Sequence, residues 1–445
     1  MAEARWLTRL KPTRRRVVTY IVVLLALLVV RLGFGAWAAW RLQGVTTRLA
    51  AVYGPLDVAS LAPPRVAPAD NRARILRAAA SLIVLQQDVL KVNELGNLLS
   101  ARGAADPAQR LVGLRRAVTE NELALSVLDR AESRPGVTWE IPYREGSRAS
   151  VPPLMEIRLL ANLSGAASLV ALADGQADEA ARHVRLGLVL ANSLAQERML
   201  IIQLIRAAIE RITLRPLRET LIAGEPSAAA LEALAARLAD AERESIGVAG
   251  LTGEMKQANS LLTEIAYGGT DFGGYARTDA NPAARAVVWV IRPFMLDAQA
   301  RMLDQFDGLI QYARLPAYQR PKTGPPTPEA AHGTPWWNPG ASWVNTMFLM
   351  GMRRTNDSSA EDDAMKRLAS TAVALRRHRV AHGAYPATLS ELDATLLPRP
   401  PVDPYTGRPV DYAREGSGFT LRITPQPSDV RDMEARDMLT WKVLR

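Results

Sequence analysis

The stretch LVALADGQADEAARHVRLGLVLANSL, residues 169–194, shows how most of this chain folds. Apolar residues recur at spacings of three and four on both sides of Gly175, which is the pattern of two amphipathic helices. Gly175 ends the first helix, because glycine adopts the backbone conformations of tight turns at little cost. Two helices joined by so short a turn run antiparallel. We therefore predict a helical hairpin built from helices near 153–173 and 176–195.

This hairpin also resembles one tetratricopeptide unit, in which a helix of small residues and a tight turn precede a second helix, here beginning DEAARH. Stacked units of that kind present a concave surface that binds peptides. The repeat of roughly 34 residues is not found on either side. The sequence therefore favours a generic antiparallel helix pair over a tetratricopeptide array.

The helical periodicity continues in both directions along the chain, so the predicted fold class is mainly α. Breaks at Gly103, Pro135-Gly136 and Gly224 divide the pattern, because such residues end helices. We expect a multi-helix ectodomain of antiparallel helical hairpins over residues 41–315, with a sub-boundary near 224. Besides the opening pair, its predicted helices lie near 70–101, 107–132, 198–222, 227–245, 251–267 and 283–313.

The N-terminal segment is apolar enough to enter a membrane. VVTYIVVLLALLVV, residues 17–30, contains fourteen residues without a charge, whereas a span needs ~20. A helix that continues to Trp40 has 24 residues, which is sufficient. The side chain of Arg31 is then expected to reach toward the outer surface, with Trp37 and Trp40 at the outer interface. We predict a single transmembrane helix over 17–40.

Basic residues before this segment predict its orientation. Residues 1–16 form a basic segment that ends in Arg14, Arg15 and Arg16, so the positive-inside rule places it in the cytoplasm. Everything after residue 40 is then expected outside the cytoplasmic membrane. A cleaved signal peptide is the alternative, because AWA at 36–38 has the small-x-small form of a cleavage site. Both interpretations predict export.

A proline-rich stretch separates the helical body from the C-terminal region. Residues 316–340 contain seven prolines, a density that favours an extended spacer over a helix. The apolar segment WVNTMFLMGM, residues 343–352, is too short to cross a bilayer. It fits either a contact with the membrane surface or a segment that packs onto the helical body. We predict a Pro/Trp-rich linker over 316–357.

The C-terminal region has the turn residues and alternating pattern of a small α/β module over 358–424. A helix of residues 358–380 is expected to end at His382-Gly383, and Thr388 with Glu391 forms a capping box for a short helix through Leu396. The stretch VDPYTGRP, residues 402–409, is rich in residues that favour turns. Apolar alternation at 410–412 and 419–423 predicts a β-hairpin whose apolar face lies on the helix. Residues 425–445 are predicted to be a polar tail.

The order of these elements over about residues 360–424 resembles the periplasmic head of the type II secretion system major pseudopilin. The residues that carry the resemblance are Gly383, Tyr385, Pro386, Leu389, Leu392, Asp403, Pro404, Tyr405, Gly407, Pro409 and Tyr412. The resemblance implies a bacterial cell-envelope protein associated with type II secretion or pilus-like systems. It does not extend to residues 1–40, which lack the glutamate that follows the cleavage site in that family.

The resemblance also bears on metal binding, because the family's calcium site follows its last strands. In this chain Asp429, Asp432 and Asp437 would be the candidate ligands, since calcium takes oxygen donors. A solvated acidic tail is the alternative. We expect no cofactor apart from this calcium ion.

Composition excludes several classes of function. The absence of cysteine rules out disulfides, thiolate catalysis and cysteine-ligated zinc. The net charge is +10, but residues 1–16 contribute five of these charges. The remainder shows no basic stripe with interleaved aromatic residues, so we expect no nucleic-acid partner.

The predicted function is that of a non-enzymatic, membrane-anchored extracytoplasmic scaffold that binds a protein partner in the cell envelope. One alternative is an envelope hydrolase that uses two carboxylates on its helices, and another is a helical protein with a cavity for a lipid or other ligand. Glu179 and His183 are expected to form a solvated surface pair. The carboxylates considered for the hydrolase are Glu210, Glu242, Glu244, Glu254 and Glu264.

Overall fold

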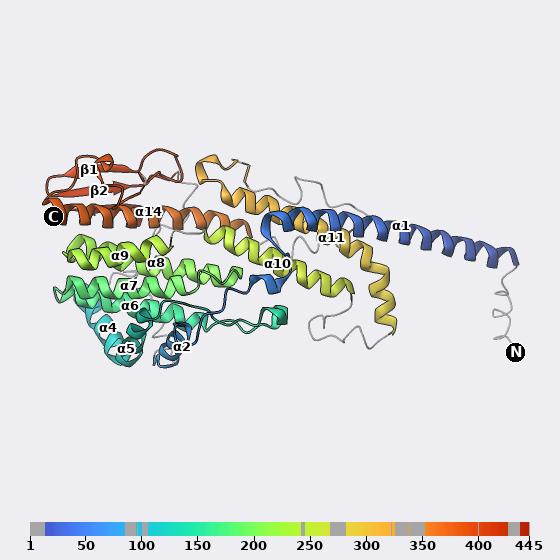
Figure 1. Ribbon diagram of the computed structural model, residues 1–445, viewed down its shortest axis with the longest axis horizontal. Coiled ribbons are helices and arrows are strands. Elements are labelled where there is room, and N and C mark those ends of the chain that lie inside the picture. Colours follow the sequence, from blue (N-terminus) through green and yellow to red (C-terminus); the bar gives the residue numbers. More distant parts are fainter. Residues whose placement is uncertain are drawn as a thin grey trace. The chain divides into compact units, whose positions relative to one another are not determined.

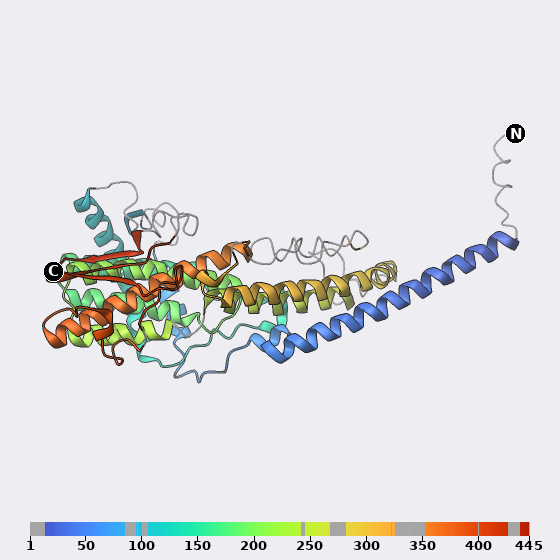
Figure 2. The ribbon, with the colours of Figure 1, turned by 90° about the horizontal axis from the view of Figure 1, so that it is seen from above.

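The computed structural model describes most of the chain, and its helices confirm that the fold is mainly α (Figures 1 and 2). The described residues are 14–84, 95, 97–99, 106–241, 245–267, 282–321, 323–324, 338, 352–398, 400–425 and 437–444. The chain divides into two compact units. The first, the α1 unit, comprises Met1–Leu56, Ala258–Asp307 and Thr327–Met350; the second, the bundle unit, comprises Asp57–Gln257, Gly308–Pro326 and Gly351–Arg445.

The α1 unit is built around one long helix. Helix α1 (Arg14–Tyr53) continues well past Trp40, where the predicted membrane segment ends. It packs against the last turns of α10 (Ile246–Tyr267) and the larger part of α11 (Pro282–Arg314). Small side chains allow this close approach, because Ala38 of α1 is fully buried with Ala266 and Leu296.

The bundle unit is centred on the hairpin at residues 169–194. Helix α6 (Leu154–Ala173) is followed by a turn in which Gly175 has a φ of +74°, and α7 (Ala177–Ser193) packs back along α6. Helix α8 (Leu200–Ala223) lies against both, and α9 (Ala228–Ala241) covers the other face of α7. Both faces of α7 are therefore buried. Leu186 and Leu190 belong to one apolar core, whereas Val184 and Leu188 belong to a second.

Shorter elements cover the outer face of α6, and they differ from two of the predicted helices. Helix α2 (Ala73–Ser81) ends well before residue 101. The helix predicted over 107–132 is split into α4 (Pro107–Glu120) and α5 (Glu122–Asp129) at Asn121. The buried Asn121 side chain donates to the carbonyl of Ala117 and accepts from the backbone of Val84. An asparagine that bonds local backbone groups competes with helix continuation.

The C-terminal helix α14 (Met352–His382) carries a three-stranded antiparallel sheet. Strands β1 (Asp411–Glu415), β2 (Gly418–Arg422) and β3 (Thr440–Val443) lie in the order β1-β2-β3. The first two strands pair through a tight turn, and Leu421 of β2 lies opposite Trp441 of β3.

Strand β3 corrects the prediction of a polar tail after residue 424. Met438, Leu439, Trp441 and Val443 are all buried, and Trp441 is fully so. The segment is only four residues long and lies far beyond the predicted hairpin. Its apolar alternation was too short to identify as a strand from the pattern alone.

The C-terminal module is also not a separate domain, which corrects the boundary predicted at the linker. Residues of α14 and the sheet, such as Leu368 and Phe419, share one continuous core with Leu217 of α8 and Leu234 of α9. In the bundle unit the sheet packs on α14, α8 and α9 pack on the same helix, and β3 also contacts α8 (Figure 1). The helical body therefore forms part of the surface on which the module folds.

Candidate functional site

The most unusual surface of the described chain is the apolar first half of α1. Every residue from Arg14 to Val30 is exposed, including Leu24 at 65% and Val29 at 68% of their full area. Soluble proteins rarely expose so long an apolar surface, because their helices usually present a polar face to water. Helix α1 is long and apolar enough to cross a membrane.

A second helix passes the same test of length and composition for a different reason. Helix α6 is apolar on nearly all sides, but 72% of its most apolar stretch is buried within the bundle unit. A helix that is hydrophobic all round and enclosed by α2, α4, α7 and α8 is a core helix. The two helices therefore differ in what covers them.

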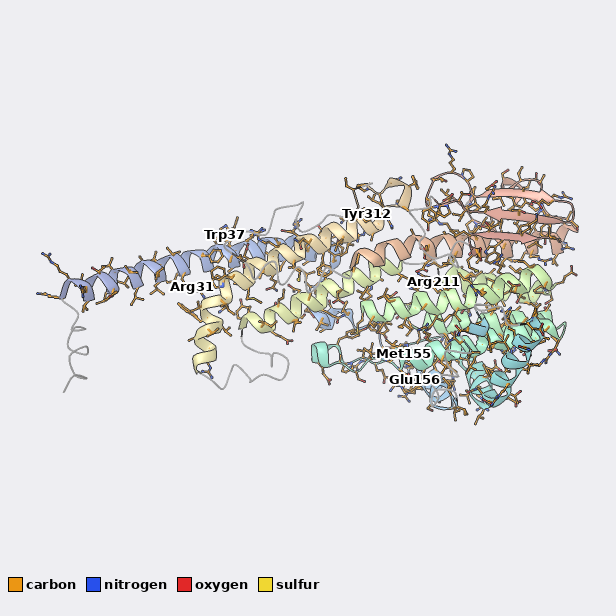
Figure 3. All side chains as sticks on the ribbon, turned by 180° about the vertical axis from the view of Figure 1, so that it is seen from behind. Arg31, Trp37, Met155, Glu156, Arg211 and Tyr312 are labelled. Atoms are coloured by element: carbon orange, nitrogen blue, oxygen red, sulfur yellow. The ribbon has the colours of Figure 1, made fainter. Side chains whose placement is uncertain are left out.

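Arg31 and Trp37 lie where α1 meets the start of α11 in the α1 unit (Figure 3). The Arg31 guanidinium stands 4.4 Å from the centre of the Trp289 ring and donates a hydrogen bond to the Trp289 carbonyl. Trp37 stacks on Phe34 at 5.7 Å, and Trp40 is 72% exposed. The three arginines before the apolar stretch, Arg14, Arg15 and Arg16, are all exposed.

Beyond Arg31, α1 is held to α11 by ion pairs that the sequence analysis did not identify. Arg41 pairs with Asp297, and Arg48 pairs with Asp304. Asp297 is fully buried and also accepts from Arg301 at 2.9 Å. In both helices the paired residues are seven apart, which keeps them on one face over two turns. That equal spacing of opposite charges was the signal available in the sequence.

The residues of the pseudopilin-like motif are brought together in the bundle unit. Gly383 has a φ of +77° and ends α14 by donating its backbone N–H to the Arg379 carbonyl. Tyr385 is buried with its ring edge-on to Phe419 at 4.9 Å, and the Tyr412 hydroxyl donates to the Pro386 carbonyl at 2.7 Å. These contacts attach the segment after α14 to the sheet.

The second half of the motif forms a turn closed by one side chain. The buried carboxylate of Asp403 accepts the backbone N–H groups of Tyr405 at 2.7 Å and Thr406 at 3.3 Å. Gly407 follows with a φ of +70°, and a Cβ there would lie 2.8 Å from the ring of Tyr318. Pro404 accepts from the Tyr318 backbone N–H through its carbonyl, and Pro409 ends the turn in a bridge with Val402.

The predicted capping box at Thr388 does not form. Leu389–Glu391 is a single 3₁₀ turn, and the Thr388 side chain accepts no backbone N–H from it. The Glu391 carboxylate instead accepts from the backbone N–H of Ala387 at 2.8 Å. Leu392 is buried in the core shared with α14, while Leu389 packs at its edge. Packing of these leucine side chains therefore holds the segment in place, and a regular helix does not.

Replacing Asp403 by alanine is expected to destabilise the protein by about 1 to 2 kcal/mol, because two turn N–H groups lose their acceptor. Urea unfolding followed by circular dichroism measures the change. Asp411→Ala, at an exposed position on β1, is the matched control and should change stability by less than about 0.5 kcal/mol. Equal losses in the two variants would show that the Asp403 turn contributes nothing particular.

His183 is buried, which corrects the prediction of a solvated pair with Glu179. Its Nε2 lies 3.2 Å from the Glu179 carboxylate, but only 9% of the residue is exposed. Burial and the neighbouring Arg182 lower the pKa of His183 to about 4, and Glu179 opposes this shift. The imidazole is therefore neutral at pH 7.

Because the pKa of His183 is lower in the folded state than in the unfolded chain, the fold should lose stability as pH falls from about 6.5 toward 4. The unfolded chain binds the proton first, so this one residue should account for about 2 kcal/mol near pH 4.5. His183→Leu should be correspondingly less sensitive to acid. The check is urea unfolding of both proteins near pH 7 and pH 4.5; an unchanged pH dependence in the variant would contradict it.

A group of buried charges lies between α8 and α14, and Glu210 is its centre. Arg206 pairs with Glu210 at 3.0 Å, and the Lys366 ammonium lies 3.5 Å from the other Glu210 oxygen. Burial alone would lower the pKa of Lys366, but Glu210 and Asp363 outweigh it and raise that pKa. All three side chains of the Arg206–Glu210–Lys366 triad are at most 5% exposed. The triad is therefore closed to a substrate.

Asp362 lies beside this triad and pairs with Arg211 at 2.8 Å (Figure 3 labels Arg211). Burial raises the pKa of Asp362 to about 6, and Arg211 opposes this shift. A carboxyl with such a pKa is suited to proton transfer in an accessible site. Its side chain is only 3% exposed, so its position fits a structural role.

A cavity of about 330 Å³ opens in the bundle unit between α14 and the segment that follows α11. Among the described residues that line it, Asp363 is the single carboxylate, and Arg314, Arg320 and Arg367 are the cations. Two of these cations already donate to protein carbonyls, since Arg367 donates to Val402 and Arg320 to Leu315. Hydrolysis by two carboxylates needs a pair at ~5 to 9.5 Å. The described residues that line this cavity do not provide that pair.

The other residues considered for chemistry are scattered. Glu254 lies half-buried on α10, where burial raises its pKa, and Glu264 is exposed near the end of the same helix. Glu242 and Glu244 lie outside the described residues, as do the candidate calcium ligands Asp429 and Asp432. Asp437 is described and lies just before β3. Among the described residues, no three histidines or carboxylates are grouped to hold a metal ion.

The fold and these surfaces define a mainly helical protein with an N-terminal helix apolar enough to span a membrane. No protein-family model matches the chain, and comparisons with curated proteins and with solved structures found no match.

Proposed function

We propose that the protein is a single-pass membrane-anchored scaffold of the bacterial cell envelope, whose bundle unit lies outside the cytoplasmic membrane and binds a protein partner. The exposed apolar surface of α1 between Arg14 and Val30 carries this proposal. Burying it in hydrocarbon is strongly favourable at ~25 cal/mol per Å² of apolar surface. The arginines at its start support an N-terminus in the cytoplasm.

The C-terminal module, which resembles the head of a pseudopilin, supports the envelope location and the binding role. Its motif residues form turns and packing contacts. They stabilise a surface that suits binding and do not form a catalytic site. We propose that this surface, together with the helices it packs on, contacts a component of a type II secretion or pilus-like system.

Topology is tested by protease treatment of intact spheroplasts that express the full chain with a tag at each end. Cleavage of the C-terminal tag before lysis, with the N-terminal tag protected, is the expected result. A C-terminal tag that is cleaved only after lysis would overturn the proposed location.

Binding is tested with cysteine cross-linking, since the native chain has no cysteine. Ala413→Cys places a reactive thiol on exposed β1, and Val112→Cys is a matched exposed position on α4. After modification with a photo-activated cross-linker in solubilised membranes, an envelope protein should be captured from the first position. The absence of any adduct from intact protein at both positions would contradict the binding role.

A further inference from the structure

The first turns of α11 form a second exposed apolar segment in the α1 unit. Val287, Trp289, Val290 and Ile291 are between 40% and 59% exposed. Helix α11 bends after its first turns, which run across the direction of α1 (Figures 1 and 2), and Pro293 lies inside the helix. Proline inside a helix removes one hydrogen bond and is a common cause of such a bend.

This segment is joined to α1 where the uncharged stretch of α1 ends. Arg31 lies over the Trp289 ring and donates to its carbonyl, and Phe34 packs on Phe294 at 5.1 Å. Gly35 approaches the Pro293 ring. The two apolar segments, residues 17–30 and 287–291, therefore belong to one compact unit and meet at Arg31.

The length of the uncharged part of α1 leaves room for this second segment at the membrane. Fourteen residues between Arg16 and Arg31 rise about 21 Å in a helix, whereas the hydrocarbon core is ~30 Å thick. Beyond Arg31, the ion pair of Arg41 with the buried Asp297 already belongs to the packed protein. Residues 32–40 of α1 continue the helix through the outer part of the membrane, and Arg31 at the start of this part lies beside Trp289 of α11.

Arginines flank the apolar turns on both sides, and cations beside an apolar surface are typical of helices at the membrane interface. Arg285 precedes them, and Arg292 follows with its guanidinium 3.8 Å from the centre of the Tyr267 ring. Tyr267 is itself 60% exposed. Tryptophan, tyrosine and arginine are enriched at the level of lipid headgroups, where an apolar body and a polar tip are both accommodated.

We infer that the first turns of α11, residues 285–292, lie in the plane of the outer membrane interface as a second lipid contact beside the α1 span. This inference rests on the proposed anchoring function of α1. The exposed apolar side chains of this segment then contact lipid at the boundary between the headgroups and the acyl chains. Arg31 is then shielded by Trp289 at this depth instead of reaching the surface alone.

The test uses single cysteines in the otherwise cysteine-free full chain, each labelled with an environment-sensitive fluorophore. Val290→Cys and Val287→Cys report on α11, Leu25→Cys on the α1 span, and Val112→Cys on the bundle unit. The proteins are reconstituted into phosphatidylcholine–phosphatidylglycerol vesicles with nitroxide quenchers at either a shallow or a deep acyl position. The shallow nitroxide should quench both α11 probes about twofold more than the deep nitroxide does. The deep nitroxide should quench the α1 probe more than the shallow one does.

The outcomes separate this inference from the anchoring proposal. If the α11 probes resemble the Val112 probe while the Leu25 probe is quenched, the in-plane contact is wrong and the anchor stands. A blue-shifted but unquenched Val290 probe would show that a protein surface covers the segment, and would also overturn the inference. If the Leu25 probe is not quenched, the anchoring proposal itself fails and the inference falls with it.

Discussion

Replacement of Leu24 and Leu27 by arginine should move the protein from the membrane fraction to the soluble fraction. Both side chains are at least 60% exposed near the middle of the apolar stretch of α1. On insertion scales an arginine at the centre of a span costs about 3 kcal/mol, so two of them disfavour insertion by about 6 kcal/mol. This corresponds to a change of roughly 10⁴-fold in the partition equilibrium.

The matched control places the same two changes on equally exposed apolar residues of the bundle unit, Val112→Arg and Leu123→Arg. This variant should remain in the membrane fraction after carbonate extraction, because its span is intact. Recovery of the unaltered protein in the soluble fraction without detergent would reject the anchoring role of α1.

Substitution of Glu210 by methionine should destabilise the bundle unit by about 3 to 5 kcal/mol, whereas Lys366→Met should cost less than about 1.5 kcal/mol. The two residues are neighbours and nearly fully buried, so the packing change is similar. The difference lies in charge. Loss of Glu210 removes the anion that Arg206 and Lys366 share and leaves Lys366 with the more exposed Asp363 at 3.7 Å, but loss of Lys366 leaves Glu210 paired with Arg206.

The double variant Glu210→Met/Lys366→Met completes the cycle and should be more stable than Glu210→Met alone by about 1 to 2 kcal/mol. Thermal and urea unfolding of the three variants measure these differences. Equal losses in the two single variants would show that packing, and not charge balance, determines the stability of this cluster.

Local chemistry explains which parts of the fold the sequence predicted. The helix pair around Gly175 follows from a spacing of three and four and from one glycine turn, which depend on neighbouring residues only. The same holds for the turn residues Gly383 and Gly407, both of which have positive φ. The helix predicted over 107–132 is wrong at Asn121, because its partner, the backbone of Val84, is distant in sequence.

The candidate site was predicted less completely than the fold. The apolar stretch of α1 and its flanking arginines are visible in the sequence, since a span requires only length and composition. The partner of Arg31 is not visible, because Trp289 lies 258 residues further along the chain. His183 was expected at the surface because its Glu179 spacing fits an exposed pair, but α7 is covered on both faces.

The sequence by itself therefore determined the helix pair around Gly175, the apolar first half of α1 and the glycine turns of the C-terminal region, because each depends on residues within a few positions of one another. Only the tertiary structure decided that β3 completes the sheet, that the C-terminal region shares its core with α8 and α9, and that Arg41 and Arg48 pair with α11. These features depend on contacts between segments far apart in the chain. Such contacts arise from packing of the whole unit, and a local pattern, such as the equal spacing of the charges on α1 and α11, does not say which segments meet.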